Sequence, residues 1–536
     1  MSTSEDSQSK NTNKLKVDAS NKKRVGIIGA GIAGLVTAKV FLSNGFEVVV
    51  FDKEPALGGV WAPSRTYPGL RANNSRETYC FSDFAHAKSV GFFPSADNIR
   101  DYLESYTDHF QIRQHIRFNR EVTQVASKDT NPNSGFEITV RNIETNTSET
   151  LHFPFVVICN GAFSKSSIPE IEGMDKFAGH ICHSSKSMDP DVADAKKVIT
   201  VGAGKSALDC AAAAAKEDKS STIVFRRAHW MAPRFFPGGI RSDLRMVSRF
   251  VELFIEYPYR TRFEKLLHGP GKPLVKLWWA VQNAVIPKAA KMAPIMIPDH
   301  KMPRGFESIG QIDDFYDLLN ADRIKAIRAG IKKFTEKGIE LDNGEHIDAD
   351  LVIFATGWKR DLSFIEESLR NQIFKSARFR LYRRILPPEQ QRLAFVGYFP
   401  TLACPISSEV AAHWTAQCFS GALSLPSLAG MDTEIERLED WARERLPESP
   451  DGIFTGPYHT HYVSDLMGDM KMQVNRTSNF LTEYLGTFFP KRYASLEKDL
   501  QAARNGDFKS TRHFYFSGLH ALVGFASLTF VWIILG

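Results

Sequence analysis

Two glycine-rich turns, each set between strand-like apolar runs and followed by a helix pattern, predict an α/β fold with two Rossmann-like units. The first stretch covers residues 24–61 and the second covers residues 197–227. Both follow the order strand, turn, helix, strand, which is the βαβ unit of parallel sheets. A helical insertion and a C-terminal transmembrane helix complete the predicted fold.

Composition limits the classes of protein that fit. A chain of 536 residues exceeds one ordinary core, so two or three domains are expected. Its net charge of +6 is spread along the sequence, without the basic stripe and interleaved aromatic residues of nucleic-acid binders. The six cysteines form no CxxC pair and no metal-ligand spacing. We therefore expect no nucleic-acid partner, no metal and no disulfide framework.

The first turn has the residues that a dinucleotide requires. A strand from Val25 to Ile28 leads into glycines at positions 29, 31 and 34, and the next strand ends at Asp52. Glycine permits a tight turn and lets a pyrophosphate approach the free N–H groups of the helix. An acid about 20 residues further on hydrogen-bonds a ribose hydroxyl. Two adjacent glycines before Val60 and Trp61 leave room for a flat ligand.

The segment that follows this unit, residues 67–84, is rich in turn-forming and polar residues. A polar loop beside a cofactor turn is a candidate site, whereas the alternative is a solvated connection of similar composition. Strand-like runs from Glu121 to Cys159 then complete a first domain, which we assign to residues 24–165.

The second turn differs from the first at the end of its second strand. Glycines at positions 202 and 204 precede Lys205, Ser206 and Ala207, and Ala is tolerated at the last position because it serves helix packing. The strand then ends in Arg226 and Arg227 instead of an acid. A guanidinium offers a planar fork for a 2′-phosphate, which favours NADPH over NADH. The alternative for this pair is a solvated strand end.

The second domain, residues 166–344, contains an unusual segment. Residues 233–310 are rich in Phe, Trp, Pro, Arg and Lys and predict a mostly helical insertion. We expect it to form part of a substrate cavity, to lie against a membrane, or to pack its own small core. Strand patterns then resume and end at Thr356 and Gly357, a small-residue turn that can approach a cofactor crevice. Residues 345–445 are assigned to the first domain as its second part, and residues 446–512 to a helical region.

Both termini differ from the body of the chain. Residues 1–23 are polar and are predicted to be disordered. Residues 514–535 carry no charge and would span about 33 Å as a helix, enough to cross a bilayer. Lys509, Arg512 and His513 precede this stretch, which places the body of the protein in the cytosol by the positive-inside rule. We expect a tail anchor in the endoplasmic reticulum; the alternative is a buried C-terminal helix or an oligomer contact.

The two turns, together with the GGVW motif at 58–61 and the ATGW motif at 355–358, resemble the flavin-containing monooxygenase family of class B flavoprotein monooxygenases. The resemblance covers residues 24–445. The family fingerprint FxGxxxHxxxY/F precedes the second turn, and Phe177, Gly179 and His183 match it. Ser187 stands where the family has an aromatic residue and where Baeyer–Villiger relatives have Trp. The RETYCFSDF segment and the apolar tail look like fungal members that modify secondary metabolites.

The resemblance implies FAD at the first unit and NADPH at the second. In the family, NADPH reduces the flavin, O₂ adds at C4a to give a hydroperoxide, and bound NADP⁺ shields this intermediate until the substrate arrives. A loop Asn contacts both cofactors near the peroxide, and Asn73 matches that position, so Asn73 is the predicted catalytic residue. A neutral amide donates a hydrogen bond without giving up a proton. We expect His183 to be structural.

The residues expected to contact FAD or NADPH are Gly29, Ala30, Gly31, Gly34, Asp52, Lys53, Gly59, Val60, Trp61, Asn73, Val122, Gly202, Gly204, Lys205, Ser206, Ala207, Arg226, Arg227, Thr356 and Gly357.

The expected function is an NADPH- and O₂-dependent FAD monooxygenase that acts on a small hydrophobic metabolite by N- or S-oxygenation, epoxidation or hydroxylation. Baeyer–Villiger oxygenation of a ketone is the near alternative. A flavin and NADPH electron-transfer reductase is an alternative of another class, but the chain lacks a CxxC pair and an iron–sulfur ligand set. A non-catalytic membrane scaffold would leave two intact cofactor turns unexplained. No protein partner is predicted.

Overall fold

The computed structural model describes residues 23–507, apart from residues 130, 188, 190, 191, 259, 260, 307, 308, 376, 377, 400 and 446–455. The predicted disordered N-terminus, except for Lys23, and the predicted transmembrane helix at 514–535 lie outside the described residues. Among the helices that are described, none is both long enough and apolar enough to cross a membrane.

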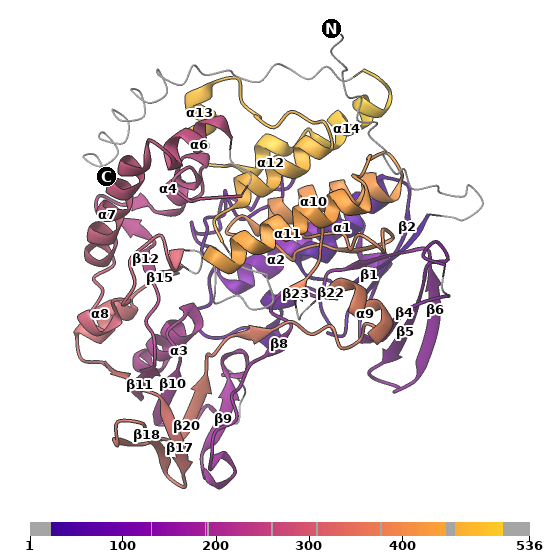
Figure 1. Cartoon of the computed structure of the whole chain (residues 1–536). Helices are drawn as coiled ribbons and strands as arrows, with labels where there is room; N and C mark the ends of the chain where they lie inside the picture. Colours follow the sequence, from indigo (N-terminus) through magenta and orange to yellow (C-terminus); the bar gives the residue numbers. More distant parts are fainter. Residues whose placement is uncertain are drawn as a thin grey trace.

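The first sheet has five parallel strands in the order β24-β7-β1-β2-β3, of which β1 and β2 are labelled in Figure 1. The strands are β1 (Arg24–Ile28), β2 (Glu47–Phe51), β3 (Ile116–Arg117), β7 (Phe155–Ile158) and β24 (Leu393–Phe395). The helix of the first unit, α1 (Ile32–Ser43), is mostly buried and packs against α10 (Cys404–Phe419). A long apolar helix thus brings the C-terminal half of the chain against the first glycine turn.

A smaller antiparallel sheet lies beside the first one. It consists of β4 (Arg120–Ser127), β5 (Phe136–Asn142) and β6 (Ser148–Phe153). Its apolar face shares a core with the main sheet, where the rings of Phe51 and Phe153 lie 5.9 Å apart. Further elements of this half are α2 (Ala96–His109), α9 (Glu367–Ile373), β22 (Phe374–Lys375) and β23 (Arg378–Phe379).

The second sheet is also parallel and has the order β16-β11-β10-β20-β9. Its strands are β9 (His180–His183), β10 (Lys197–Val201), β11 (Ser220–Phe225), β16 (Ile324–Arg328) and β20 (Leu351–Phe354), with α3 (Lys205–Lys216) and α8 (Phe315–Asn320) beside them. An antiparallel meander of β17 (Ile331–Thr335), β18 (Gly338–Leu341) and β19 (His346–Asp348) adjoins it. The predicted α/β fold with two Rossmann-type units is confirmed.

One predicted boundary needs correction. Strand β20 pairs with β10 and β9 in the second sheet, whereas the boundary expected at residue 345 had placed it with the first unit. The four residues of β20 are all buried and apolar, so their pattern fits the centre of either parallel sheet. The chain crosses to the first unit only after β20, where β21 (Trp358–Lys359) pairs with β8 (Lys165–Ser166).

The described part of the insertion contains helices and short strands. The helices are α4 (Asp243–Met246), α5 (Arg249–Glu252), α6 (Arg262–His268) and α7 (Lys272–Ala289). The strands are β12 (Met231–Pro233), β13 (Phe235–Phe236), β14 (Ile240–Arg241) and β15 (Gly310–Ile312), with β12 parallel to β15 and β13 antiparallel to β14. The stacked rings of Phe254 and Trp278, 4.3 Å apart, belong to the same core as α1 and α10. The insertion therefore packs on the rest of the protein.

The C-terminal region is helical where it is described. It comprises α11 (Leu428–Arg445), α12 (His459–Asp469), α13 (Phe480–Tyr484) and α14 (Leu496–Arg504), which cross the upper part of Figure 1. Helix α12 packs on α10 and α5. The Lys39 ammonium of α1 bonds Glu497 of α14 at 2.8 Å, so the described end of the chain returns to the first unit.

Candidate active site

The first glycine turn lies at the carboxyl end of β1 and is too tight for side chains. Gly29 has a φ of +108°, and a Cβ there would lie 2.6 Å from the carbonyl oxygen of Cys159. A Cβ on Gly34 would lie 1.8 Å from the carbonyl oxygen of Gly29. Helix α1 follows with Gly31 as its N-cap, and no side chain bonds its first N–H groups. A turn without side chains lets a dinucleotide pyrophosphate approach the backbone, and the unbonded N–H groups at the start of α1 can donate to its oxygens.

The GGVW segment lies directly over this turn. The N–H of Gly58 donates to the carbonyl oxygen of Ala30 at 3.1 Å, and a Cβ on Gly59 would lie 3.1 Å from the Cα of Gly31. Val60 is exposed, whereas Trp61 is buried and donates from Nε1 to Tyr79 Oη at 3.3 Å. The structure thus brings together the two glycine segments that the sequence predicts as one cofactor crevice.

Asp52 stands beside the turn, at the carboxyl end of β2. Its Oδ2 accepts from Ala30 N at 2.5 Å and its Oδ1 from Glu54 N at 2.9 Å. Burial raises the pKa of this carboxyl, while the two N–H donors act in the opposite direction. Each oxygen keeps a lone pair for a ribose hydroxyl. Lys53 is exposed, and Val122 lies two residues beyond Arg120, whose N–H donates to the Asp52 carbonyl oxygen at 2.8 Å.

The second turn repeats this geometry at the end of β10. Gly202 has a φ of +128°, and a Cβ there would lie 2.6 Å from the carbonyl oxygen of Ala355. That Cβ would also lie 3.6 Å from Ala207 Cβ, an ordinary contact, so Ala fits the third position. Nothing lies within 4 Å of a Cβ on Gly204, the N-cap of α3, and no side chain caps this helix. This open helix start fits a second pyrophosphate.

The second unit has basic residues at the start of α3 and after β11. Arg226 and Arg227 follow β11 and are exposed, and the carbonyl oxygen of Arg226 accepts from Arg328 Nε at 3.4 Å. No carboxylate among the described residues pairs with Arg226. Lys205 forms an ion pair with Asp209, one turn along α3, and Ser206 Oγ donates to Tyr67 Oη at 3.1 Å. Tyr67 begins the polar loop of the first unit, so this loop contacts the second turn directly.

Thr356 and Gly357 lie where the chain crosses between the two units. Thr356 Oγ1 donates to the carbonyl oxygen of Ser167 at 2.5 Å, and Gly357 O accepts from Ser167 N at 3.0 Å. His183 of the fingerprint also bonds this crossing, because its Nε2 donates to Gly357 O at 3.1 Å. Burial lowers the pKa of His183. A buried, neutral imidazole tied to a linker agrees with the expected structural role.

The fingerprint glycine has a steric reason. A Cβ on Gly179 would lie 2.4 Å from the carbonyl oxygen of Asp350 and 2.5 Å from Phe177 Cζ. Glycine therefore lets β9 approach the start of β20 while the Phe177 ring packs over the same point.

Asn73 lies in the polar loop between the units and is half-buried. Its Oδ1 accepts from Gln311 N of β15 at 3.3 Å. No described residue accepts a hydrogen bond from its side-chain amide NH₂. The loop backbone is fixed on the other side by Ala72 N, which donates to Pro94 O at 3.0 Å. The amide acceptor is thus occupied by the protein, and the amide donor is left for a ligand.

Sequence reasoning missed the residues of the insertion that hold this loop. Arg234 Nη1 donates to Ala72 O at 2.6 Å, and Asp243 Oδ2 accepts from Ser75 N at 2.9 Å. Gln311, directly after the insertion, completes the set through its backbone. None belongs to a motif, and each is more than 150 residues from its partner. The sequence carries no signal that singles them out, because the insertion has many polar and charged residues and their burial shows only in the structure.

A second anchor holds the far end of the loop. Glu409 of α10 accepts from Ser82 N at 2.8 Å and from Ser82 Oγ at 2.5 Å. Burial raises the pKa of Glu409 to about 7; the nearby Asp83 carboxylate raises it further, while the Ser82 donors and Lys39 lower it.

Glu409→Gln is expected to flatten the pH dependence of stability. The native Glu409 carboxyl binds a proton up to about pH 7, whereas an unfolded carboxyl, with its ordinary pKa of 4.5, does so only in more acidic solution. Between these values the native state holds more protons, so its free energy of unfolding falls as pH rises, by at most about 1.4 kcal/mol per pH unit from this group. Glutamine has no proton to lose. Urea unfolding of both proteins from about pH 5 to about pH 7.5 gives their free energies of unfolding. The value for the variant should rise relative to that of the wild type as pH rises. A difference that is the same at every pH would contradict the assignment.

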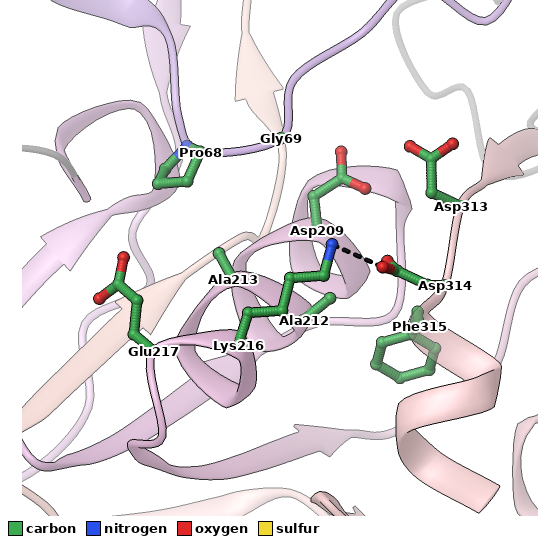
Figure 2. A pocket seen from close by; sticks show the side chains of 10 residues that line it. All are labelled: Pro68, Gly69, Asp209, Ala212, Ala213, Lys216, Glu217, Asp313, Asp314 and Phe315. Atoms are coloured by element: carbon green, nitrogen blue, oxygen red, sulfur yellow. Dashed lines mark ion pairs between the residues drawn. The ribbon is translucent and has the colours of Figure 1, made fainter.

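A cavity of about 220 Å³ lies beside α3 (Figure 2). Pro68 and Gly69 of the loop form one side, and α3 and the start of α8 form the other. Its acids are Asp209, Glu217, Asp313 and Asp314, and its single base, Lys216, pairs with Asp314 at 2.6 Å. An acidic lining repels phosphate, so this cavity is not the pyrophosphate site.

Comparison with known proteins identifies the class. Residues 22–485 match the family model described as flavin-binding monooxygenase-like, and the chain belongs to this family. It is therefore a flavoprotein monooxygenase that uses FAD and NADPH, as the sequence predicted.

Individual relatives are distant. The chain is 26% identical over 464 residues to flavin-containing monooxygenase 5 of Cavia porcellus, covering 82% of this chain and 81% of the relative. It is also 26% identical over 436 residues to a 4-hydroxybenzoate brominase (decarboxylating) of Marinomonas mediterranea, covering 79% of each. The solved structure of OTEMO complexed with FAD and NADP has a similar fold, with a TM-score of 0.59 and 18% identity over 92% of this chain and 99% of that chain.

Proposed function

We propose that this monooxygenase oxygenates a small hydrophobic metabolite, and that Asn73 is the residue that touches the reacting groups. FAD supplies the oxygen chemistry when it is bound, and the protein binds, orients and shields. The reaction class proposed is N- or S-oxygenation, epoxidation or hydroxylation. The relatives named above show how far substrate chemistry varies within such a family, because one is a brominase. Substrate choice therefore depends on this chain's own cavity.

The proposal assigns one cofactor to each turn. FAD would be held by Gly29, Ala30, Gly31, Gly34, Asp52, Lys53, Gly59, Val60, Trp61, Val122, Thr356 and Gly357. NADPH would be held by Gly202, Gly204, Lys205, Ser206, Ala207, Arg226 and Arg227, with Asn73 between the two. The acid at the end of β2 and the arginines at the end of β11 support this division.

The role of Asn73 is supported by its side-chain amide, whose oxygen accepts a hydrogen bond from the protein while its NH₂ group has no acceptor among the described residues. Its Oδ1 is held by Gln311 N at 3.3 Å, which turns the NH₂ group to the other side of the side chain. A fixed neutral donor can hydrogen-bond an oxygen species at the flavin without protonating it. Loss of this donor should release oxygen as H₂O₂ instead of transferring it to the substrate.

Asn73→Asp tests this role, because Asp keeps the acceptor for Gln311 N and replaces the donor by an oxygen. We expect the fraction of NADPH electrons released as H₂O₂ to rise several-fold, while FAD content stays at the wild-type level. Asn98→Asp is the matched control: Asn98 accepts from Ser95 N at 3.2 Å in the capping box of α2, and Asp can do the same. Equal H₂O₂ release from wild type and Asn73→Asp would remove Asn73 from the reaction.

Baeyer–Villiger oxygenation of a ketone is the second candidate. The fingerprint does not decide between the two reactions. Ser187 stands where the flavin-containing monooxygenases have Tyr or Phe and where the Baeyer–Villiger relatives have Trp. Product analysis with methyl phenyl sulfide and with a cyclic ketone as parallel probes separates the two reactions: a sulfoxide supports the first candidate and a lactone supports the second.

We also propose that residues 514–535 anchor the protein in a membrane, with the catalytic body in the cytosol, and that the membrane is the endoplasmic reticulum. The support is the uncharged apolar stretch and the basic residues before it. A chain ending at residue 512 is expected to move from the membrane pellet to the supernatant of a cell lysate, while the full chain resists extraction by alkaline carbonate. If the shortened chain still pellets with membranes, the anchor lies elsewhere.

A further inference from the structure

A carboxylate of the helical insertion grips the loop that carries Asn73. Asp243 is the first residue of α4 and is 1% exposed. Its Oδ2 accepts two hydrogen bonds from the loop, one from Ser75 N at 2.9 Å and one from Thr78 Oγ1 at 3.1 Å. Ser75 is two residues from Asn73, so the carboxylate acts on the backbone turn that sets the direction of the Asn73 side chain.

Other contacts from the insertion reinforce this grip. Arg234 Nη1 donates to Ala72 O at 2.6 Å, and Arg241 Nη1 donates to Glu77 Oε2 at 2.8 Å. With the Asp243 bonds, the insertion contacts the loop both before and after Asn73. Asn73 therefore cannot shift relative to β15 unless several bonds to the insertion also change.

Packing alone does not require a charge at position 243. Oδ1 of Asp243 is buried and has no hydrogen-bond partner among the described residues. Such a carboxylate is costly to bury, and a neutral amide could accept the same two bonds. What the loop needs at position 243 is therefore an acceptor for Ser75 N and Thr78 Oγ1, which Asp provides and Asn can also provide.

We propose that Asp243 is a positioning residue for the oxygenation, which through Ser75 and Thr78 holds Asn73 at the reacting flavin. This inference rests on the role proposed above for Asn73. Asp243 does not contact the reacting atoms itself. Asp243 couples the insertion to the loop of Asn73. A structural change in the insertion therefore alters the fraction of oxygen released as H₂O₂ without changing either glycine turn.

The test compares Asp243→Ala with Asp243→Asn in the full-length holoenzyme. Alanine removes both accepted bonds, so amide hydrogen exchange in residues 72–78 should become at least about tenfold faster. The fraction of NADPH electrons released as H₂O₂ should rise several-fold, with FAD content and the KM for NADPH unchanged. Asparagine keeps an acceptor for Ser75 N and Thr78 Oγ1, and it should restore most of both properties.

Two further variants protect the test against a general loss of stability. Ser248→Ala removes a buried hydroxyl of the same insertion, which donates to Arg245 O at 2.8 Å and does not bond the loop. It should keep wild-type exchange in the loop and wild-type H₂O₂ release. Thr78→Val keeps the shape of the loop and removes one donor to Asp243, so it should raise H₂O₂ release if Asp243→Ala does not fold.

The outcomes separate this inference from the proposal on which it rests. Increased H₂O₂ release from Asn73→Asp but wild-type release from Asp243→Ala would overturn the positioning role alone. Wild-type release from both would overturn the role of Asn73 as well. If Ser248→Ala raises H₂O₂ release as much as Asp243→Ala does, any loosening of the insertion is sufficient to raise it. That result would overturn the specific role of Asp243.

Discussion

Gly34→Ala is expected to abolish FAD binding. The new Cβ would lie 1.8 Å from the carbonyl oxygen of Gly29, a backbone atom within the same turn. Neither atom can rotate away, so α1 must move away from the turn. The N–H groups at the start of α1 then no longer point at the pyrophosphate. The purified variant should contain less than about one tenth of the wild-type flavin absorbance per protein, and its Tm should fall because the stabilisation by bound FAD is lost.

Gly468→Ala is the matched control for this substitution. Gly468 lies in α12, and a Cβ there would meet nothing within 4 Å. Alanine is the better helix former, so this variant should keep its flavin and unfold at or slightly above the wild-type temperature. A Gly34→Ala protein that purifies with full flavin would show that FAD does not depend on the first turn.

Replacement of Arg226 and Arg227 by Ala should reverse much of the preference for NADPH. Both side chains are exposed at the end of β11, where a 2′-phosphate would lie in a Rossmann unit. A hydrogen bond to a charged group contributes about 1.5–3 kcal/mol, so the KM for NADPH should rise at least about tenfold. The KM for NADH should change little, because NADH has no 2′-phosphate.

Arg323→Ala provides the control for lost surface charge, since Arg323 is exposed in the same unit and pairs with Asp218. It should leave both KM values unchanged. An equal rise for NADPH and NADH in the double variant would contradict the assignment of the second turn to NADPH.

The sequence predicts the local parts of this protein well, because each of them depends on neighbours in the chain. The clash that requires glycine at position 34 is with Gly29, five residues earlier, and the places of Asp52 and Arg226 follow from the βαβ pattern. The fingerprint at Phe177 and Gly179 is different, because it marks a close approach to Asp350 in a distant segment and is recognised only as a family motif.

The same reasoning fails where contacts join distant segments. Strand β20 was assigned to the wrong unit. A fully apolar strand fits the centre of either parallel sheet, so its sequence does not show which sheet it belongs to. The bonds from Asp243 to Ser75 and from Glu409 to Ser82 span 168 and 327 residues, and no spacing rule connects such pairs. Both bonds involve the loop of Asn73, so the part of the site that the sequence missed is the part that holds Asn73 in place.

Rapid mixing with oxygen tests the central claim most directly, namely that the Asn73 loop directs O₂ into oxygenation. The wild type and Asn73→Asp would each be reduced with NADPH, mixed with O₂ without substrate, and followed by absorbance in a stopped-flow instrument. The wild type should form a flavin–oxygen adduct that persists, and Asn73→Asp should lose this adduct several-fold faster while releasing H₂O₂. Direct return of the wild type to oxidised flavin, with no adduct, would contradict the account.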